Sequence, residues 1–341
     1  MESANILPAA GIITLTYHRV NNTDTDPWNI CVSPENFEAQ IKFLNHNFNV
    51  ISVPDLVKQV TTKRITKDSV CISFDDGYAD NFIHAKPILE RYNCPAAFFI
   101  ASGFINQAKS FWWDELEIIF LHTKQLPACL CLIINNNEYN YCIEETELSE
   151  EQWKKHENWK WFENAPTSRC KVFLDIWTKL RSLELRKIRE LVLTIRNWAA
   201  VNDFSFIDRA PMNKQQLKEL SLHKLFTIGL HTHTHIDLTG KQKFVQQQEI
   251  STCKNYLSKL NIQANMLAYP YGRFDDNSIE AVTAFNLDAC FTTKAGKIYT
   301  DSDLHKLNRW QVCNWDVTGL EKHLNTWMND EQSAKDIIDS L

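Results

Sequence analysis

Residues 70–77 read Val-Cys-Ile-Ser-Phe-Asp-Asp-Gly. β-Branched and apolar side chains dominate the first five positions, which is typical of a buried strand. Asp75, Asp76 and Gly77 follow at once and predict a turn where this strand ends. Adjacent carboxylates repel each other, so a site that holds both must offer them different environments, such as a metal ion for one and hydrogen bonds for the other. Taken alone, Asp75, Asp76 and Gly77 also fit a solvated turn that caps the next helix.

Short apolar runs alternate with helical patterns on both sides of this stretch. Strands are predicted at 12–17, 70–74, 96–100, 226–230, 266–269, 289–293 and 307–312. Helices are expected after the caps Ser33 and Ser52 and, from apolar spacings of three and four, at about 79–92, 213–222, 244–260 and 277–285. Strands that alternate with helices imply parallel β/α units. The predicted fold class is therefore α/β, with a deformed (β/α) barrel interrupted once as the most economical architecture.

Residues 106–212 break this rhythm. Most of the tryptophans fall here, together with long helical patterns at about 167–180 and 184–202 and one short β-like piece at 129–134. These long helical patterns predict a mainly helical insertion. The chain then divides into a first barrel part at 1–105, the insertion at 106–212, a second barrel part at 213–316 and a C-terminal helical tail at 317–341.

Two further polar blocks follow predicted strands. Gly-Leu-His-Thr-His-Thr-His occupies 229–235, and Ala-Tyr-Pro-Tyr-Gly occupies 268–272. On a helical turn His231 and His235 would share one face and reach one metal ion, whereas in an extended segment all three histidines would face one side. The second block can aim the backbone N–H of Tyr271 at a developing oxyanion. A chance run of surface histidines and an ordinary turn are the plainer alternatives.

The positions of the three blocks suggest one shared site. Reactive groups of parallel α/β folds gather where the carboxyl ends of the strands meet. Zinc and related divalent ions accept two imidazoles and a carboxylate and keep positions open for water and substrate. A second carboxylate beside the metal supplies a general base. Together the blocks predict metal-assisted hydrolysis of an amide or an ester.

In their order and spacing, these blocks resemble the signature of the NodB-like polysaccharide deacetylases, carbohydrate esterase family 4. The resemblance rests on Ser-Phe-Asp-Asp-Gly-Tyr-Ala-Asp-Asn at 73–81, His-Thr-His-Thr-His at 231–235 and Ala-Tyr-Pro-Tyr-Gly-Arg-Phe-Asp-Asp at 268–276. Leu-Thr-Tyr-His-Arg-Val at 15–20 and the segment 33–56 also look like a branch of this family. The resemblance covers about 1–105 and 213–312 and implies the fold of a NodB-type barrel.

The resemblance also implies a role for each matching residue. Asp75 becomes the base that activates water. Asp76, His231 and His235 become the ligands of a divalent metal ion, taken to be Zn²⁺. The backbone amide of Tyr271 stabilises the oxyanion together with the metal.

Two positions depart from the family pattern. Leu267 stands where many members carry an arginine, and we expect Arg309 to replace that arginine by pairing with Asp75, although a structural salt bridge is the commoner fate of such a residue. No Leu-x-His block follows the strand at 307–312. In a circularly permuted branch His18 takes that place and protonates the leaving amine; a core histidine bonded to a loop is the alternative. His233, at the variable middle position, is expected not to bind metal.

Composition narrows the function further. A net charge of −6 and a pI near 6.0 indicate no excess of positive charge for binding nucleic acid or anionic lipid. The ten cysteines contain no CxxC pair, and no Lys or Arg precedes the first apolar run, where a signal peptide would be positive. No stretch approaches the ~20 apolar residues of a membrane span. We therefore expect free cysteines, no transmembrane segment and a cytoplasmic location.

The function that these observations favour is removal of an N-acyl group, acetyl or formyl, from an amino sugar. A nucleotide- or lipid-linked sugar on the way to a surface polysaccharide suits a cytoplasmic enzyme. The alternatives are a catalytically silent sugar-binding protein and a metal-dependent phosphoesterase, although no phosphate contacts are evident beside the blocks. The tryptophans of the insertion could stack on sugars, since Phe-Trp-Trp-Asp at 111–114 follows a strand closely. We favour the alternative that these tryptophans form the hydrophobic core of the insertion itself.

Overall fold

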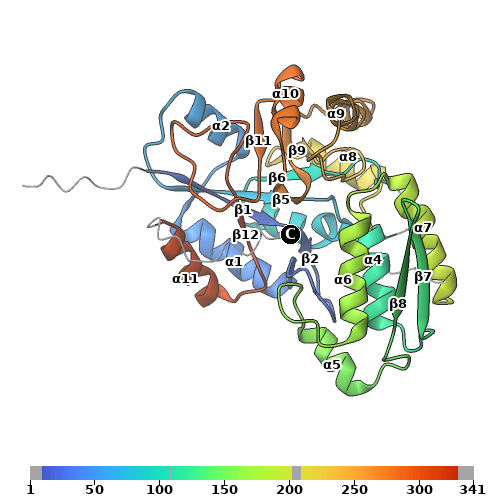
Figure 1. Ribbon diagram of the computed structural model, residues 1–341. Coiled ribbons are helices and arrows are strands. Elements are labelled where there is room, and N and C mark those ends of the chain that lie inside the picture. Colours follow the sequence, from blue (N-terminus) through green and yellow to red (C-terminus); the bar gives the residue numbers. More distant parts are fainter. Residues whose placement is uncertain (1–9, 107–109, 202–208, 329–341) are drawn as a thin grey trace, which may run out of the picture.

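The computed structural model describes residues 10–106, 110–201 and 209–328, and its centre is a curled parallel sheet (Figure 1). In these residues the sheet has the strand order β11-β10-β9-β6-β5-β1-β12, with β4 added beside β5. Its strands are β1 Ile12–Tyr17, β4 Asn49–Val50, β5 Ser69–Phe74, β6 Ala96–Ile100, β9 Phe226–Leu230, β10 Met266–Ala268, β11 Ala289–Phe291 and β12 Trp310–Gln311. All of these pairings are parallel, so the predicted α/β class is confirmed.

The two edges of the sheet meet through residues 304–312. Leu307 donates its N–H to the carbonyl of Cys290 and accepts the N–H of Thr292, at 2.9 Å each. A few residues later β12 pairs with β1, where Leu15 lies opposite Trp310. Because one segment bonds to both β11 and β1, the sheet closes into the deformed barrel that the sequence predicts.

Strand alternation decides which side chains face the inside of the barrel. Ile12, Cys71, Phe99, Phe291 and Leu307 belong to one buried cluster, whereas their strand neighbours pack in a second cluster with the surrounding helices. Side chains alternate with a period of two, so positions two, four and six residues further along a strand point the same way. Positions 18, 75, 309 and 311 therefore continue the inward-facing rows to the carboxyl end of the barrel.

Helices surround the sheet. They are α1 Pro34–Asn47, α2 Val53–Thr61, α3 Lys86–Arg91, α8 Lys214–Leu222, α9 Lys243–Ser258, α10 Asp276–Ala284 and α11 Val317–Met328. The predicted caps are present, because the side chains of Ser33 and Ser52 accept backbone N–H groups of the first turns of α1 and α2. The helix expected at 79–92 begins with a π-helical turn at Asn81–Ala85 and continues as α3. In the predicted tail, α11 buries three apolar side chains and packs against α1.

A second group of elements packs on one side of the barrel (Figure 1). It comprises α4 Trp112–Glu117, α5 Glu150–Asn158, α6 Ser168–Leu180, α7 Leu185–Trp198 and the hairpin β7 Cys129–Ile134 with β8 Asn137–Cys142. These elements share a hydrophobic cluster of their own. Strand β8 and the short ribbon of β2 Arg19–Val20 with β3 Cys31–Val32 were not predicted. None of the helices in the described part of the chain combines the length and hydropathy of a membrane span.

Candidate active site

The acidic block turns sharply at the end of β5. Asp75 extends the inward row of Cys71 and Ser73, and its N–H donates to the carbonyl of Tyr17 at 3.1 Å. Asp76 and Gly77 both have positive φ angles, 71° and 92°. Glycine tolerates this left-handed conformation and aspartate adopts it more readily than most residues. The turn therefore places two adjacent carboxylates in different surroundings, as the repulsion between them requires.

The histidine block folds into a loop after β9. Thr232 and His235 have positive φ angles of 60° and 56°, so this segment is neither a helix nor an extended strand. Glu249 of α9 holds the loop by accepting the N–H groups of His233 and Thr234 at 2.9 and 2.8 Å. The ring of His233 turns away and bonds through Nδ1 to Ser102. His231 and His235 are left facing Asp76.

These three side chains form a compact cluster of potential metal ligands. The Nε2 atoms of His231 and His235 lie 3.4 and 3.2 Å from Oδ1 of Asp76, and one donor atom from each residue lies within 4.8 Å of the others. Nδ1 of His231 faces the carbonyl of Ala268 at 2.8 Å, which fixes the tautomer and leaves Nε2 as the lone-pair donor. Oδ1 of Asp76 is buried and, within the described residues, accepts no hydrogen bond. A borderline divalent cation such as zinc fits this donor set.

Charge and burial act in opposite directions on these groups. Burial by itself would raise the pKa of Asp76, but the neighbouring imidazoles of His235 and His231 hold that pKa well below its ordinary value. Burial lowers the pKa of His235 more than Asp76 raises it. A carboxylate that stays ionised beside a neutral imidazole is the form in which both groups bind a cation.

Asp75 is held by Arg309 through two parallel hydrogen bonds. Nη1 and Nη2 of Arg309 donate to Oδ1 and Oδ2 of Asp75 at 2.8 and 2.7 Å, and both side chains are at most 3% exposed. The guanidinium also donates to the carbonyl of Thr292 and lies near the rings of Phe99 and Phe291. Burial raises the pKa of Asp75, but Arg309 overcomes this effect and holds it below its ordinary value. The pairing expected for Arg309 is therefore present.

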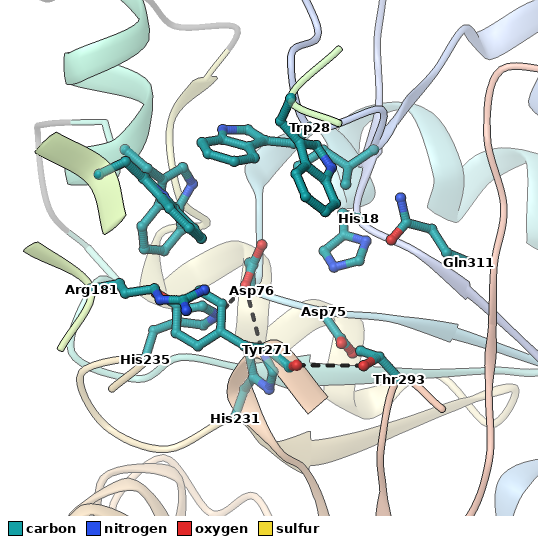
Figure 2. Close-up of a pocket in the computed structure, with 14 residues that line it drawn as sticks. His18, Trp28, Asp75, Asp76, Arg181, His231, His235, Tyr271, Thr293 and Gln311 are labelled. Atoms are coloured by element: carbon teal, nitrogen blue, oxygen red, sulfur yellow. Dashed lines mark hydrogen bonds and ion pairs between the residues drawn. The ribbon is translucent and has the colours of Figure 1, made fainter. Parts of the chain in front are cut away.

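His18 and Tyr271 approach the same centre from β1 and β10. Both line the cavity that contains Asp75, Asp76, His231 and His235 (Figure 2). His18 has a buried Nδ1 that no group in the described residues hydrogen-bonds, while its carbonyl accepts Nδ2 of Asn81 at 2.8 Å. Tyr271 has φ 59° and ψ 9°, and its ring lies against His235 with centroids 4.7 Å apart.

The cavity has a volume of about 150 Å³ and a strongly aromatic wall. Trp113, Trp161 and Trp177 come from the segment 106–212, and Trp28 comes from the loop before β3. Trp28 and Trp177 contact each other with ring centroids 4.3 Å apart, and Trp113 lies 4.9 Å from His235. Trp113 and Trp177 belong to the buried cluster of the segment 106–212, as the favoured interpretation expected, and they also line the cavity, which that interpretation did not include.

Comparison with known families accounts for this arrangement. The model of the family "Polysaccharide deacetylase" matches residues 62–152 and 177–290, which together make up more than half of the chain. The chain belongs to this family. The deacetylases of the family are hydrolases that act on amide bonds. The matched residues include Asp75, Asp76, His231, His235 and Tyr271, and the match extends into the segment 106–212.

Individual relatives agree with this assignment. YxkH of Bacillus subtilis, which is assigned to the polysaccharide deacetylases, is 19% identical over 301 residues, covering 87% of this chain and 70% of YxkH. The poly-beta-1,6-N-acetyl-D-glucosamine N-deacetylase of Staphylococcus aureus is 32% identical over 108 residues, or 28% of this chain and 37% of that enzyme. The structure resembles that of the Streptococcus pyogenes deacetylase PplD in complex with acetate, with a TM-score of 0.56, 18% identity and coverage of 92% and 97% of the two chains. The NodB-type barrel predicted from the sequence is confirmed.

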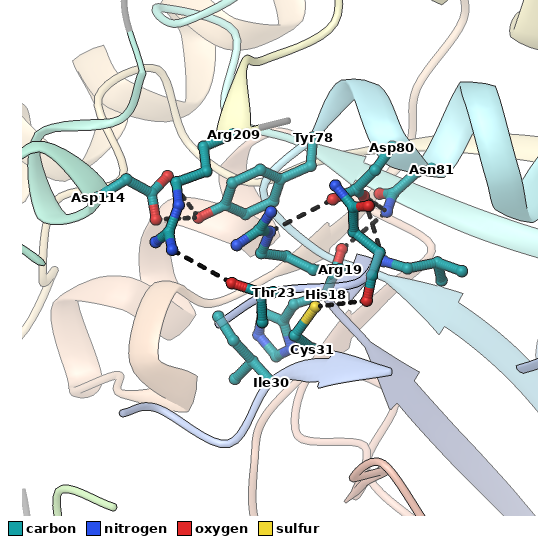
Figure 3. Close-up of polar contacts among 12 residues, drawn as sticks. His18, Arg19, Thr23, Ile30, Cys31, Tyr78, Asp80, Asn81, Asp114 and Arg209 are labelled. Carbon is teal, nitrogen blue, oxygen red and sulfur yellow. Dashed lines mark hydrogen bonds and ion pairs between the residues drawn. The ribbon is translucent and has the colours of Figure 1, made fainter. Parts of the chain in front are cut away.

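In this deacetylase, residues just beyond the two aspartates secure neighbouring parts of the site (Figure 3). The hydroxyl of Tyr78 accepts the indole N–H of Trp113 at 2.7 Å and donates to the carboxylate of Asp114 at 3.1 Å. Asp80 accepts the N–H of Val20 and pairs with Arg19 at 3.3 Å. The block that supplies Asp75 and Asp76 thus also anchors the backbone next to His18 and the ring of Trp113.

Several residues that line the cavity of the deacetylase were not predicted from the sequence. They are Trp28, Ile30, Arg181, Thr293 and Gln311. Gln311 lies two residues after Arg309 in the strand predicted at 307–312. The alternation of side chains along a strand would therefore have predicted that both point into the barrel. The loop that bears Trp28 is fixed by tertiary contacts, since the carbonyl of Pro27 accepts the N–H of Trp161 at 2.9 Å and that of Asp26 accepts Nζ of Lys160 at 2.6 Å. A contact between segments about 130 residues apart leaves no local pattern.

Proposed function

We propose that this deacetylase removes an N-acyl group from an amino sugar with the help of a divalent metal ion held by Asp76, His231 and His235. The observation that supports the proposal is one cavity that contains this cluster, the ion-paired carboxylate of Asp75 and an aromatic wall. Aromatic faces suit the apolar faces of pyranose rings. Zinc is the metal we propose, because borderline ions prefer mixed imidazole and carboxylate ligands.

Asp75 is proposed as the general base. When bound, a divalent cation supplies Lewis acidity toward the acyl carbonyl and the attacking water. Asp75 accepts the proton of that water on its carboxylate, which retains free lone pairs beside the two hydrogen bonds from Arg309. A base must be ionised at the working pH, and the charge of Arg309 keeps the Asp75 carboxylate ionised at neutral pH. Arg309 also fixes the plane of the carboxylate and acts as a positioning residue.

His18 and Tyr271 are proposed to complete the reaction. His18 protonates the nitrogen of the departing amine, because it lines the cavity and one of its ring nitrogens lacks a hydrogen-bond partner in the described residues. The backbone N–H of Tyr271 donates to the oxyanion that develops on the acyl carbonyl. The left-handed conformation of Tyr271, which costs free energy for a tyrosine, is consistent with a turn shaped for this purpose.

The sugar and its carrier define the finer part of the proposal. The Staphylococcus aureus relative is named for a polymer, poly-beta-1,6-N-acetyl-D-glucosamine. For this chain we propose a nucleotide- or lipid-linked amino sugar that carries an acetyl or formyl group, in keeping with the predicted cytoplasmic location.

The proposal is tested by release of acetate or formate from a panel of acylated amino sugars. The panel contains free, nucleotide-linked and lipid-linked sugars and the poly-β-1,6-linked polymer, and metal content is measured on the same protein. Asp75→Asn should abolish turnover and keep the metal content near that of the wild type, whereas Asp76→Asn should lose both. Normal turnover by Asp75→Asn would contradict the assignment of the base. Metal and sugar binding without any acyl release would identify a sugar-binding protein.

A further inference from the structure

Arg181 is a cation at the cavity that the proposed reaction does not use. It follows the last residue of α6 and lines the cavity together with the metal-ligand cluster. Its guanidinium lies over the rings of Trp177 and Tyr271, at 5.1 and 5.8 Å from their centroids (Figure 2). Cation–π attraction to these rings uses none of the guanidinium N–H groups, which stay available for a ligand.

The charge of Arg181 is not neutralised by the protein. Within the described residues, no carboxylate lies within ion-pairing distance of its guanidinium and no acceptor hydrogen-bonds it. The nearby carboxylate of Asp237 is paired with Arg273 at 3.0 Å. Burial lowers the pKa of Arg181, an effect that Tyr271 and Asp237 offset only in part. A partly buried cation without a counter-ion destabilises the free protein and is stabilised when an anion binds.

We infer that Arg181 binds an oxyanion, such as a phosphate or carboxylate group, carried by the amino sugar whose N-acyl group faces Asp75. This inference rests on the proposed function and narrows the substrate to a negatively charged amino sugar. The fixed plane of the guanidinium allows two parallel hydrogen bonds to such a group. The indole ring of Trp177 lies beside the guanidinium and that of Trp28 contacts Trp177, and both would contact the sugar ring. Neutral polymers of N-acetylglucosamine lack the group that Arg181 recognises.

Titration calorimetry with two probes tests this inference on the zinc-loaded protein. The probes are N-acetylglucosamine 1-phosphate and N-acetylglucosamine, and the variants are Arg181→Gln, Arg181→Lys and the matched control Arg186→Gln. Arg186 belongs to the same segment, but its side chain is 80% exposed. Loss of one charge-assisted pair of hydrogen bonds corresponds to a loss of affinity of about ten- to a hundredfold.

We expect Arg181→Gln to lower the affinity for the phosphorylated probe by about ten- to a hundredfold and the affinity for the neutral probe by less than about twofold. Arg181→Lys should fall between wild type and Arg181→Gln, because it keeps the charge and loses the planar pair of donors. Arg186→Gln should bind both probes as the wild type does. Equal binding of the two probes by the wild type, or equal losses in Arg181→Gln, would overturn the inference. Acetate release from the same mixtures reports separately on the proposed reaction, so binding without release would refute that reaction and leave the anion site intact.

A second and independent observation concerns the exposed face of the hairpin β7–β8. Cys129 lies directly opposite Cys142 in the antiparallel register, and both side chains are exposed. The preceding pair is hydrogen-bonded, since the N–H of Ile143 donates to the carbonyl of Ala128 at 2.8 Å. Cys129 and Cys142 therefore form a non-hydrogen-bonded pair, the kind in which Cα atoms lie about 4.5 Å apart. That spacing is within the range of disulfides.

The geometry points to a reversible disulfide between Cys129 and Cys142. With oxidised glutathione as the oxidant, one thiolate attacks the glutathione disulfide and releases one glutathione thiol. The second cysteine then attacks the mixed disulfide and releases another, so two protein thiols become one disulfide as one glutathione disulfide becomes two thiols. Cys131 is exposed on the same face but lies diagonal to Cys142, where the separation is about 7 to 8 Å.

Intact-mass measurement after incubation with oxidised glutathione and alkylation tests this pairing. The wild type should take up two fewer alkyl groups than the fully reduced protein, and peptide mapping should link Cys129 to Cys142. Cys131→Ser is the matched control and should form the same link, whereas Cys142→Ser should form none. Mixed disulfides with glutathione at Cys129 and Cys142, or a link that includes Cys131, would overturn the inference.

Discussion

Replacing Arg309 by methionine should expose how much the proposed base depends on its partner. The substitution keeps most of the apolar volume of the side chain and removes both hydrogen bonds to Asp75. Removal of one partner from a buried ion pair costs about 3 to 5 kcal/mol, because the remaining charge stays buried without compensation. The carbonyl of Thr292 loses its guanidinium donor as well, which adds about 1 kcal/mol. We expect Arg309→Met to destabilise the metal-free protein by about 4 kcal/mol at pH 7.

Urea unfolding of four proteins measures this coupling. The set is the wild type, Arg309→Met, Asp75→Asn and the double variant, all with chelator present. The double variant should recover about half or more of the loss, because it contains neither buried charge. Purely additive effects, with a coupling free energy below about 0.5 kcal/mol, would refute the argument that the ion pair is one energetic unit.

The pH dependence of the same variants gives an independent check. Arg309 holds the pKa of Asp75 below its ordinary value, so this carboxylate contributes stability that is present above an unfolded pKa of about 4 and is lost as the pH falls through the folded pKa. Without Arg309, burial raises the pKa of Asp75, and protonation removes the uncompensated charge. The difference in the free energy of unfolding between the wild type and Arg309→Met should therefore become smaller as the pH falls from 7 toward 4. A difference that stays constant over this range would argue against Asp75 as the cause.

Three further substitutions test other parts of the structure. Burial raises the pKa of Asp114 to about 7, an effect that two arginines offset only in part. Protonated Asp114 therefore makes the free energy of unfolding of the wild type fall as the pH rises from about 4 to about 7. Asp114→Asn should lose this pH dependence, which urea unfolding midpoints at pH 4.5 and 7.5 will show. His231→Ala should lower metal affinity by more than about a hundredfold in a competition with a chelator, while His233→Ala retains wild-type affinity. Gly272→Ala should reduce stability by about 1 to 3 kcal/mol and impair turnover, because Gly272 has φ +67° and an added Cβ would clash with Thr293; thermal unfolding and acetate release at wild-type levels would contradict this.

The parallel barrel was predictable because each of its strands carries its own signal. β5 and β9 are short, apolar and followed directly by polar residues, so both the strands and the site at their ends follow from local pattern. Arg309 was harder to place, since β12 is only two residues long and its register against β1 depends on tertiary pairing. The contact with Asp75 joins residues 234 positions apart.

The hairpin in the middle of the chain was recognised only in part. β7 alternates buried and exposed residues, but β8 reads Asn-Glu-Tyr-Asn-Tyr-Cys and is mostly polar. Asn135 and Asn136 between them both have positive φ angles, 51° and 63°, as a type I′ hairpin turn requires. The pair of asparagines was therefore an available signal for the second strand. The direction in which Trp113 and Trp177 face was not available, because it depends on how α4 and α6 pack against the barrel.

Closure of the barrel by residues 304–312 has a consequence for the order in which the protein is made. Translation proceeds from the N-terminus at about 5 to 20 residues per second, so β1 and β5 leave the ribosome many seconds before β12. During that interval the Asp75 carboxylate has no guanidinium beside it, and the edge of β1 that pairs with β12 stays open. A nascent chain shorter than about 310 residues should therefore lack both a closed barrel and an ion-paired base, which makes the last strand the step that matures the site.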